Sequence, residues 1–166
     1  FLQKFPFALS KHSYYLPLMP YVFEQFDLSK FDIVISSCHS ASKGIITKPR
    51  TMHICYCHSP MRYAWDNSHE YMERYGIPEP LQTLAKRKLQ DIRLWDRLAA
   101  DRVDFFVANS EFSKRRIQKY YRRDCEVIYP PIDTKKFQMT KKKEGKYYLA
   151  VSRLTPYKRL DLVIAV

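Results

Sequence analysis

The stretch "VDFFVANSEFSKRRIQKYY", residues 103–121, changes from one hydrophobic pattern to another within a few positions. Its first eight residues form a short apolar run that is typical of a β-strand. Ser110 is a good helix N-cap, Glu111 suits the positive end of a helix, and apolar residues then recur at helical spacing. The stretch therefore predicts a strand followed directly by a helix.

The same alternation extends in both directions along the chain. A helix is predicted over 80–102, where apolar residues recur every three or four positions. Further short apolar runs predict strands at 31–37, 52–58, 125–130 and 147–153. Strand–helix–strand order predicts an α/β fold, a Rossmann-like parallel sheet with flanking helices. Because the runs are mostly continuous in apolar character, we expect strands that are covered on both faces.

The organisation of the chain predicts one nearly complete domain and the start of a second. We assign residues 1–130 to the first domain and 131–146, proline-rich and then lysine-rich, to an exposed linker. Residues 147–166 are expected to supply the first strand and helix of the second domain. The chain begins at Phe1 and ends inside an apolar stretch. We therefore expect a truncated portion of a longer polypeptide.

Composition and charge narrow the class of protein. A hydrophobic content of 46% is typical of an ordered globular protein. Residues 1–80 hold 8 Lys and Arg against 7 Asp and Glu, whereas residues 81–166 hold 21 against 10. This asymmetry indicates an anionic partner, namely nucleic acid, an anionic membrane surface or a phosphorylated substrate, or else a solvated basic face. Four cysteines do not suggest a disulfide scaffold, and reduced thiols in the cytoplasm are expected.

The stretch "LAVSRLTPYKRLD", residues 149–161, places two cations around a predicted strand-to-helix turn. Thr155 and Pro156 suit a helix start, so Lys158 is expected in the first turn, and Arg153 ends the preceding strand. A helix N-terminus with two cations can bind phosphate. By spacing alone, ordinary loop charges are the favoured explanation of the pattern. Three glycines in the whole chain exclude a glycine-rich phosphate loop.

The stretch "HICYCHSPMRYAWD", residues 53–66, gathers thiols and imidazoles. Cys55 and Cys57 are expected on one buried strand face. Zinc is not expected, because zinc sites use Cys pairs with two to four residues between them, and only one residue separates this pair. His58 lies where the strand ends, which is where α/β folds bind ligands. From the residues alone, His58 is either a hydrogen-bonded core histidine or a ligand-contacting group.

Four ordered motifs resemble those of the retaining, nucleotide-sugar-dependent glycosyltransferases of family 4. They are "HSPMRYAWD" (58–66), "VANSEFSKRRI" (107–117), "VIYPPIDTKKF" (127–137) and "LAVSRLTPYKRLDLVI" (149–164), and the resemblance covers about 31–166. It implies the GT-B architecture, with two Rossmann-like domains facing each other across a cleft. This chain would be most of the N-terminal acceptor domain and the beginning of the donor domain.

The resemblance also implies roles for individual residues. Arg153 and Lys158 would hold the donor diphosphate, and His58 would reach the cleft near the transferred sugar as the catalytic residue. The substrate would be a nucleotide sugar such as GDP-mannose or a UDP-sugar, with mannose preferred, and no cofactor. No Asp-x-Asp pair is present to hold a divalent ion, so no metal is expected. Candidates for the acceptor or the cleft are Arg62, Tyr63, Asn109 and Glu111.

The expected partners are a nucleotide sugar and a glycan or lipid-linked acceptor. Basic residues of two predicted helices suggest peripheral attachment to the inner face of a membrane from the cytoplasm. The alternative is a basic nucleic-acid-binding or non-catalytic membrane-associated module. No helix-turn-helix, zinc-finger or RNA-recognition signature supports nucleic-acid binding. We expect residues 1–166 to be inactive by themselves, because they hold only the start of the donor domain.

Overall fold

The computed structural model describes residues 12–66, 68, 78–137, 145, 147–154 and 158–165. The chain divides into two compact units, Phe1–Pro131 and Ile132–Val166. The predicted linker over 131–146 falls partly outside the described residues, so its boundaries stay a prediction.

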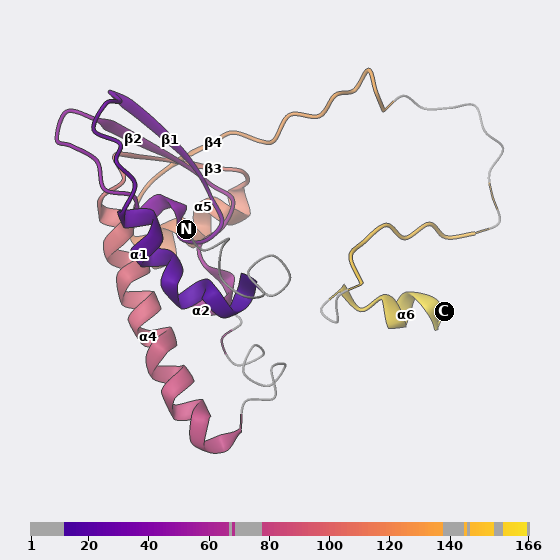
Figure 1. Cartoon of the computed structure of the whole chain (residues 1–166). Coiled ribbons are helices and arrows are strands. Elements are labelled where there is room, and N and C mark those ends of the chain that lie inside the picture. The colour runs from indigo at the N-terminus through magenta and orange to yellow at the C-terminus, as the bar shows by residue number, and fades with distance from the viewer. Residues whose placement is uncertain are drawn as a thin grey trace. The chain divides into compact units, whose positions relative to one another are not determined.

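The first unit is built on a parallel sheet of four strands in the order β1-β2-β3-β4 (Figure 1). Cys38 lies opposite Cys57, and Cys57 lies opposite Ala108, so the carboxyl ends of three strands meet along one edge. The prediction of an α/β fold with a parallel sheet and flanking helices is confirmed. The strands are β1 (Ile33–Cys38), β2 (Met52–Cys57), β3 (Phe105–Ala108) and β4 (Glu126–Val127).

Two long helices lie on one side of the strands (Figure 1), where the sequence predicts them. In α5 (Glu111–Tyr121), the Ser110 side chain accepts a hydrogen bond from the Ser113 amide at 3.2 Å, which confirms the N-cap. Arg122 closes α5 in the left-handed conformation, with φ of 53°. The other described elements of this unit are η2 (His12–Leu18), α1 (Met19–Glu24), η3 (Ser42–Gly44), α2 (Arg62–Trp65) and α4 (Glu79–Asp101).

Burial alternates along the strands, and the covered face forms the main core. Side chains of β1, β2 and β3 on this face share one cluster with residues of α5 and of the end of α4. Closely packed apolar groups withdrawn from water are the chief stabilising contribution in such a layer. The buried members are Cys38, Cys55, Cys57, Ala100, Val103, Phe106, Ala108, Ile117, Tyr121 and Cys125.

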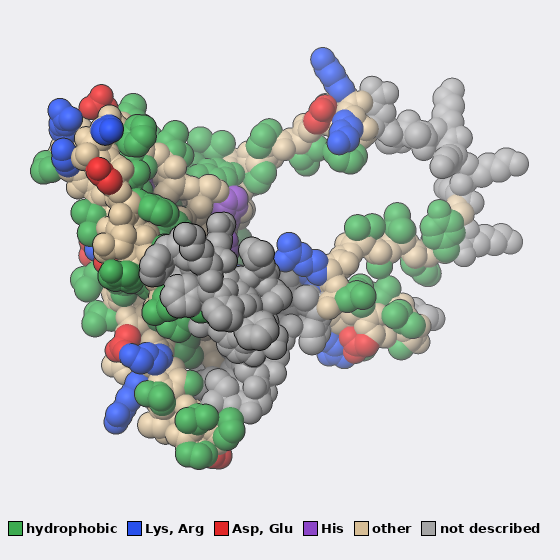
Figure 2. All heavy atoms as spheres, viewed as in Figure 1, with side chains coloured by type: hydrophobic (Ala, Val, Ile, Leu, Met, Phe, Trp, Pro, Cys, Tyr) green, Lys and Arg blue, Asp and Glu red, His purple; other side chains and the backbone are tan. Residues whose placement is uncertain are grey.

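The opposite face of the sheet is apolar but exposed. Ile33, Ile35, Met52 and Phe105 all point to this side, and Ile35 is 70% exposed. Figure 2 shows hydrophobic side chains on the surface of the first unit. The prediction of strands covered on both faces is therefore wrong for the described part of the chain. The reason is that α5 and the end of α4 pack on the same face, and no other described helix covers this one.

A second cluster lies beside the sheet, where α1, η3, α2 and α4 meet. Gly44 is required here by close packing, because a Cβ on it would lie 2.2 Å from the Trp95 ring. The buried members are Ala41, Met61, Ala64 and Ile92, with Met19, Phe23, Tyr63, Trp65 and Trp95 packed against them.

The second unit differs from its prediction in two places. Residues 147–154 contain no strand, because a strand needs a hydrogen-bonded neighbour and no described residue pairs with this stretch. Helix α6 (Leu160–Ile164) begins after Arg159, so Lys158 lies in a 3₁₀ turn before this helix instead of in its first turn. The predicted helix start at Thr155 and Pro156 lies outside the described residues.

Candidate functional site

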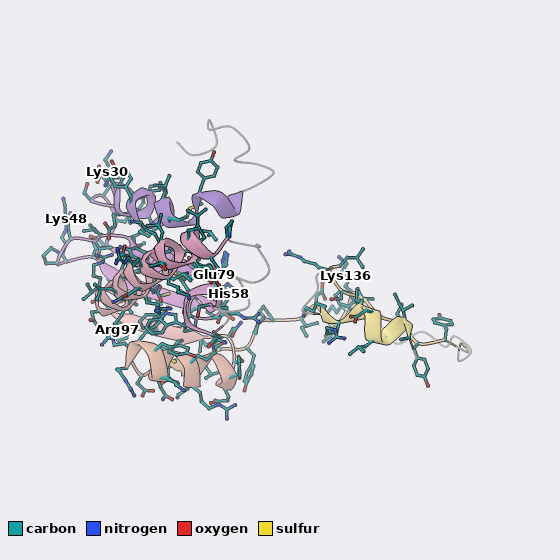
Figure 3. All side chains as sticks on the ribbon, turned by 90° about the horizontal axis from the view of Figure 1, so that it is seen from below. Lys30, Lys48, His58, Glu79, Arg97 and Lys136 are labelled. Carbon is teal, nitrogen blue, oxygen red and sulfur yellow. The ribbon has the colours of Figure 1, made fainter. Side chains whose placement is uncertain are left out.

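The carboxyl ends of β1, β2 and β3 bring polar side chains to one edge of the sheet. Ser37 precedes the last residue of β1, His58 follows β2 directly, and Asn109 follows β3. In open parallel sheets, ligands bind outside this edge, because the loops that leave the strands surround it. Figure 3 shows His58 on the side of the first unit away from Lys48, which precedes β2.

His58 is exposed, yet its backbone and its ring are both held in place. Its amide donates to the Cys38 carbonyl at 2.8 Å, and its carbonyl accepts from the Ser113 hydroxyl at 2.8 Å. The ring Nε2 and the Ser37 Oγ are 2.8 Å apart, and the ring meets Tyr56 edge-on with centroids 5.2 Å apart. The structure thus presents a fixed, solvent-accessible imidazole, and the interpretation of His58 as a core histidine is wrong.

His53, five residues earlier, is the core histidine of this stretch. Its side chain is fully buried on the covered face, and its Nε2 lies 2.8 Å from the Ser36 Oγ. Burial lowers the pKa of His53 to about 4, although the Asp104 carboxylate opposes this shift. Among the described residues, its Nδ1 has no hydrogen-bond partner. Cys55 and Cys57 are also fully buried on this face, as predicted.

The segment after His58 forms α2 and gives the aromatic residues different surroundings. Arg62 is exposed at the start of α2. The Tyr63 hydroxyl lies 3.3 Å from the Ser40 Oγ, while its ring packs on the second cluster. Trp65 packs on the same cluster and stacks on Tyr120, with centroids 4.8 Å apart. Trp65 is therefore a packing residue of the first unit.

Asn109 and Glu111 flank the start of α5 at the same edge. The Asn109 Oδ1 accepts a hydrogen bond from the Ser110 hydroxyl at 3.1 Å, which helps to order the turn. Glu111 is exposed in the first turn of α5, where its negative charge interacts favourably with the positive end of the helix dipole. Helix capping accounts for Ser110. The structure thus brings His58, Arg62, Tyr63, Asn109 and Glu111 to the loops at one edge, whereas any contact of theirs with a substrate stays a prediction.

Arg153 and Lys158 lie in the second unit, and both are exposed. Their role in holding a diphosphate stays a prediction. The neighbouring Arg159 donates to the Asp161 carboxylate at 2.9 Å.

Comparison with known protein families decides the class of the protein. The family model described as Glycosyltransferase Family 4 matches residues 2–136, which is most of the chain. The chain belongs to glycosyltransferase family 4. A search of curated proteins and a search of solved structures found no match. Family membership makes the chain part of a transferase, with a sugar donor and an acceptor as its general partners.

Two residues that position His58 in this glycosyltransferase were missed by sequence reasoning. Ser37 contacts the ring and Ser113 contacts the carbonyl, across 21 and 55 positions of sequence. A usable signal existed for Ser37, because the register of parallel strands places it on the same face as Tyr56 and His58. Ser113 gave no such signal, since a serine in the first turn of a helix is explained by capping alone.

The described residues form neither a metal-binding cluster nor a membrane-spanning helix. Within the ranges that the structure describes, no three His, Cys, Asp or Glu side chains gather closely enough to hold a metal ion. Nor does any helix in those ranges have the length and hydropathy needed to cross a bilayer.

Proposed function

We propose that the chain is the acceptor-side part of a retaining GT-B glycosyltransferase that uses a nucleotide-sugar donor. The observation that carries this proposal is the exposed, hydrogen-bonded His58 at the carboxyl edge of a parallel sheet in a family 4 chain. An imidazole in this place can donate a hydrogen bond to a sugar hydroxyl or to the transferring oxygen. Mannose is the sugar that we propose first, from the likeness of "HSPMRYAWD" to mannosyl-type members.

Glycosyl transfer needs positive charge near the leaving group. The bond between sugar and phosphate breaks, so negative charge grows on the diphosphate while the sugar becomes cation-like. Arg153 and Lys158 are the cations that we propose for this charge. One charge pair at about 4 Å gives roughly 4 kcal/mol at an effective dielectric constant near 20. If half of this free energy arises only in the transition state, the rate rises about 30-fold.

The acceptor would be a glycan or a lipid-linked sugar, bound beside His58. Arg62 and Glu111 are exposed, so they are the residues of this edge that we propose to contact its hydroxyl or phosphate groups directly. Tyr63 and Asn109 are half-buried and already bonded to Ser40 and Ser110, so we propose that they shape the loops around the acceptor.

A donor screen on the full-length polypeptide tests the proposal, reading the release of UDP or GDP from a panel of nucleotide sugars. Lys158→Ala and Arg153→Ala are each expected to lower turnover more than tenfold. Arg159→Ala is the matched control, because this exposed cation already pairs with Asp161. The role of the two cations is refuted if all three variants turn over like the wild type. The whole proposal is refuted if no sugar nucleotide is consumed.

We also propose peripheral attachment to an anionic membrane at the cytoplasmic face. Several cations in α4 and α5 or just after them have partners within the protein, including Lys88, Arg93, Arg102 and Arg123. Those left exposed contribute about 1 kcal/mol each near an anionic leaflet. They are Lys86, Arg87, Arg115, Lys119 and Arg122.

Vesicle flotation distinguishes this attachment from nucleic-acid binding. Lys86→Glu with Arg87→Glu should weaken flotation on phosphatidylserine vesicles at low salt, whereas Lys30→Glu, on the turn before β1, should not. Equal flotation of both variants contradicts the proposal. Salt-sensitive binding to an arbitrary oligonucleotide, without flotation, would favour the nucleic-acid-binding alternative.

A further inference from the structure

Asp96 of α4 is a fully buried carboxylate that bonds to three different elements of the first unit. Its Oδ1 accepts a hydrogen bond from the ammonium of Lys43 in η3. Its Oδ2 accepts from the Trp65 indole at 2.7 Å and from the Tyr121 hydroxyl at 2.8 Å. One carboxylate therefore ties together η3, α2, α4 and α5.

Lys43 is also fully buried and has no exposure to water. It donates a second hydrogen bond to the Ser40 carbonyl at 3.2 Å, and its ammonium lies 5.0 Å from the centre of the Tyr121 ring. A buried ammonium without a counter-charge is strongly unfavourable, so Lys43 and Asp96 depend on one another. Tyr121 is held neutral in this setting, because burial and the Asp96 charge raise its pKa well above the ordinary value.

The network reaches both loops that carry the proposed site. On the first loop, Ser42 donates to the Ser37 carbonyl at 2.9 Å, and Ser37 is the partner of the His58 ring. On the second loop, Trp65 ends the short helix that follows His58. The two loops also meet directly, where the Ser40 and Tyr63 hydroxyls lie 3.3 Å apart. Lys43 and Trp65 thus fix both loops to the same carboxylate.

We propose that Asp96 is a positioning residue, which with Lys43 sets the two loops against each other and so maintains the contact between Ser37 and His58. The link to sugar transfer rests on the proposed function, whereas the link to the His58 ring does not. A buried ion pair adds little net stability compared with apolar groups of the same size. Because this pair is connected to two loops of the site, we assign it the role of positioning these loops and not that of core packing alone.

The histidine ring signals test this proposal without any substrate. The polypeptide is labelled with ¹³C at histidine Cε1, and the signal of His58 is assigned by its loss in His58→Gln. Ser37→Ala gives the shift that follows from losing the direct partner. At the same pH, Asp96→Asn and Trp65→Phe should each move the His58 signal in the direction of Ser37→Ala. Trp65→Phe removes one donor only and leaves the ion pair intact, so it decides the matter if Asp96→Asn does not fold.

Val103→Ala is the matched control, because it removes buried volume from the main core but no hydrogen bond of the network. A purely structural role predicts that all folded variants leave the His58 signal in place, or that Val103→Ala moves it equally. Either result overturns the proposal. In the full-length protein, Trp65→Phe should lower kcat by a larger factor than the factor by which it changes KM. If the wild type transfers no sugar, the proposed function fails, while the ring signals still decide on Asp96.

Discussion

The side chains of two histidines in and just after β2, His53 and His58, point to opposite faces of the same sheet. His53 faces the helices, is fully buried and keeps a lowered pKa. His58 faces the other side, is exposed, and follows the last residue of its strand. Successive side chains of a strand alternate between faces, so an offset of five residues is enough to separate a core group from an accessible one. Residue type alone does not identify a functional histidine, but its face and its distance from the strand end do.

The largest expected difference between the two faces concerns apolar truncation. Ile117→Ala, on the covered side, should lower the free energy of unfolding by about 2–5 kcal/mol through lost burial and a cavity. Ile35→Ala, at a position that is 70% exposed, should change it by less than about 0.5 kcal/mol. Urea unfolding of both variants makes the measurement. Equal losses would mean that the second face is covered in the native protein.

The next effect is on activity. His58→Ala should lower sugar transfer by the full-length protein on the order of 100-fold or more, which is typical of a lost acid–base or hydrogen-bonding group. Its unfolding midpoint should stay close to that of the wild type, because the ring is exposed. Lys48→Ala, on the far side of the unit (Figure 3), is the control and should keep full activity. Activity within twofold of the wild type in His58→Ala would remove His58 from the mechanism.

The third effect is the pH dependence that His53 gives to stability. The folded protein keeps this ring neutral down to a pKa of about 4, whereas the unfolded chain binds a proton near pH 6.5. Its contribution to the free energy of unfolding is therefore complete above pH 6.5 and is lost as pH falls towards 4. The loss is on the order of 3 kcal/mol. Urea titrations from pH 7 to 4 should show a flatter profile for His53→Gln, and parallel profiles would contradict the assignment.

Local patterns predicted the first unit well. The strand and helix around 103–121 were predicted correctly, including the cap at Ser110, because both signals lie within a few residues. The burial of Cys55 and Cys57 followed from strand alternation. The family motifs indicated the class of enzyme, which the family model confirms.

What the sequence did not reveal depends on distant contacts. The strand expected at 147–153 carries strand-like residues, but strand formation depends on a neighbour that this stretch does not find among the described residues. The pairing of Lys43 with Asp96 joins positions that are 53 residues apart, and each residue by itself looks like an ordinary surface charge. Coverage of the sheet likewise depends on the face against which α4 and α5 pack. The apolar residues of the strands do not show which face this is.

The buried cysteine thiols on the covered face of the sheet can report how often the helices separate from the sheet. The hydrogen bond with Cys55, together with burial, raises the pKa of Cys38 well above its usual value. For Cys55, the bond with Cys38 lowers the pKa, but the bond with Cys57 and burial outweigh it and raise the pKa to about 12. Since only a thiolate reacts readily with alkylating reagents, these groups stay inert while the layer is closed. The rate at which a thiol reagent consumes them therefore measures how often the helices part from the sheet.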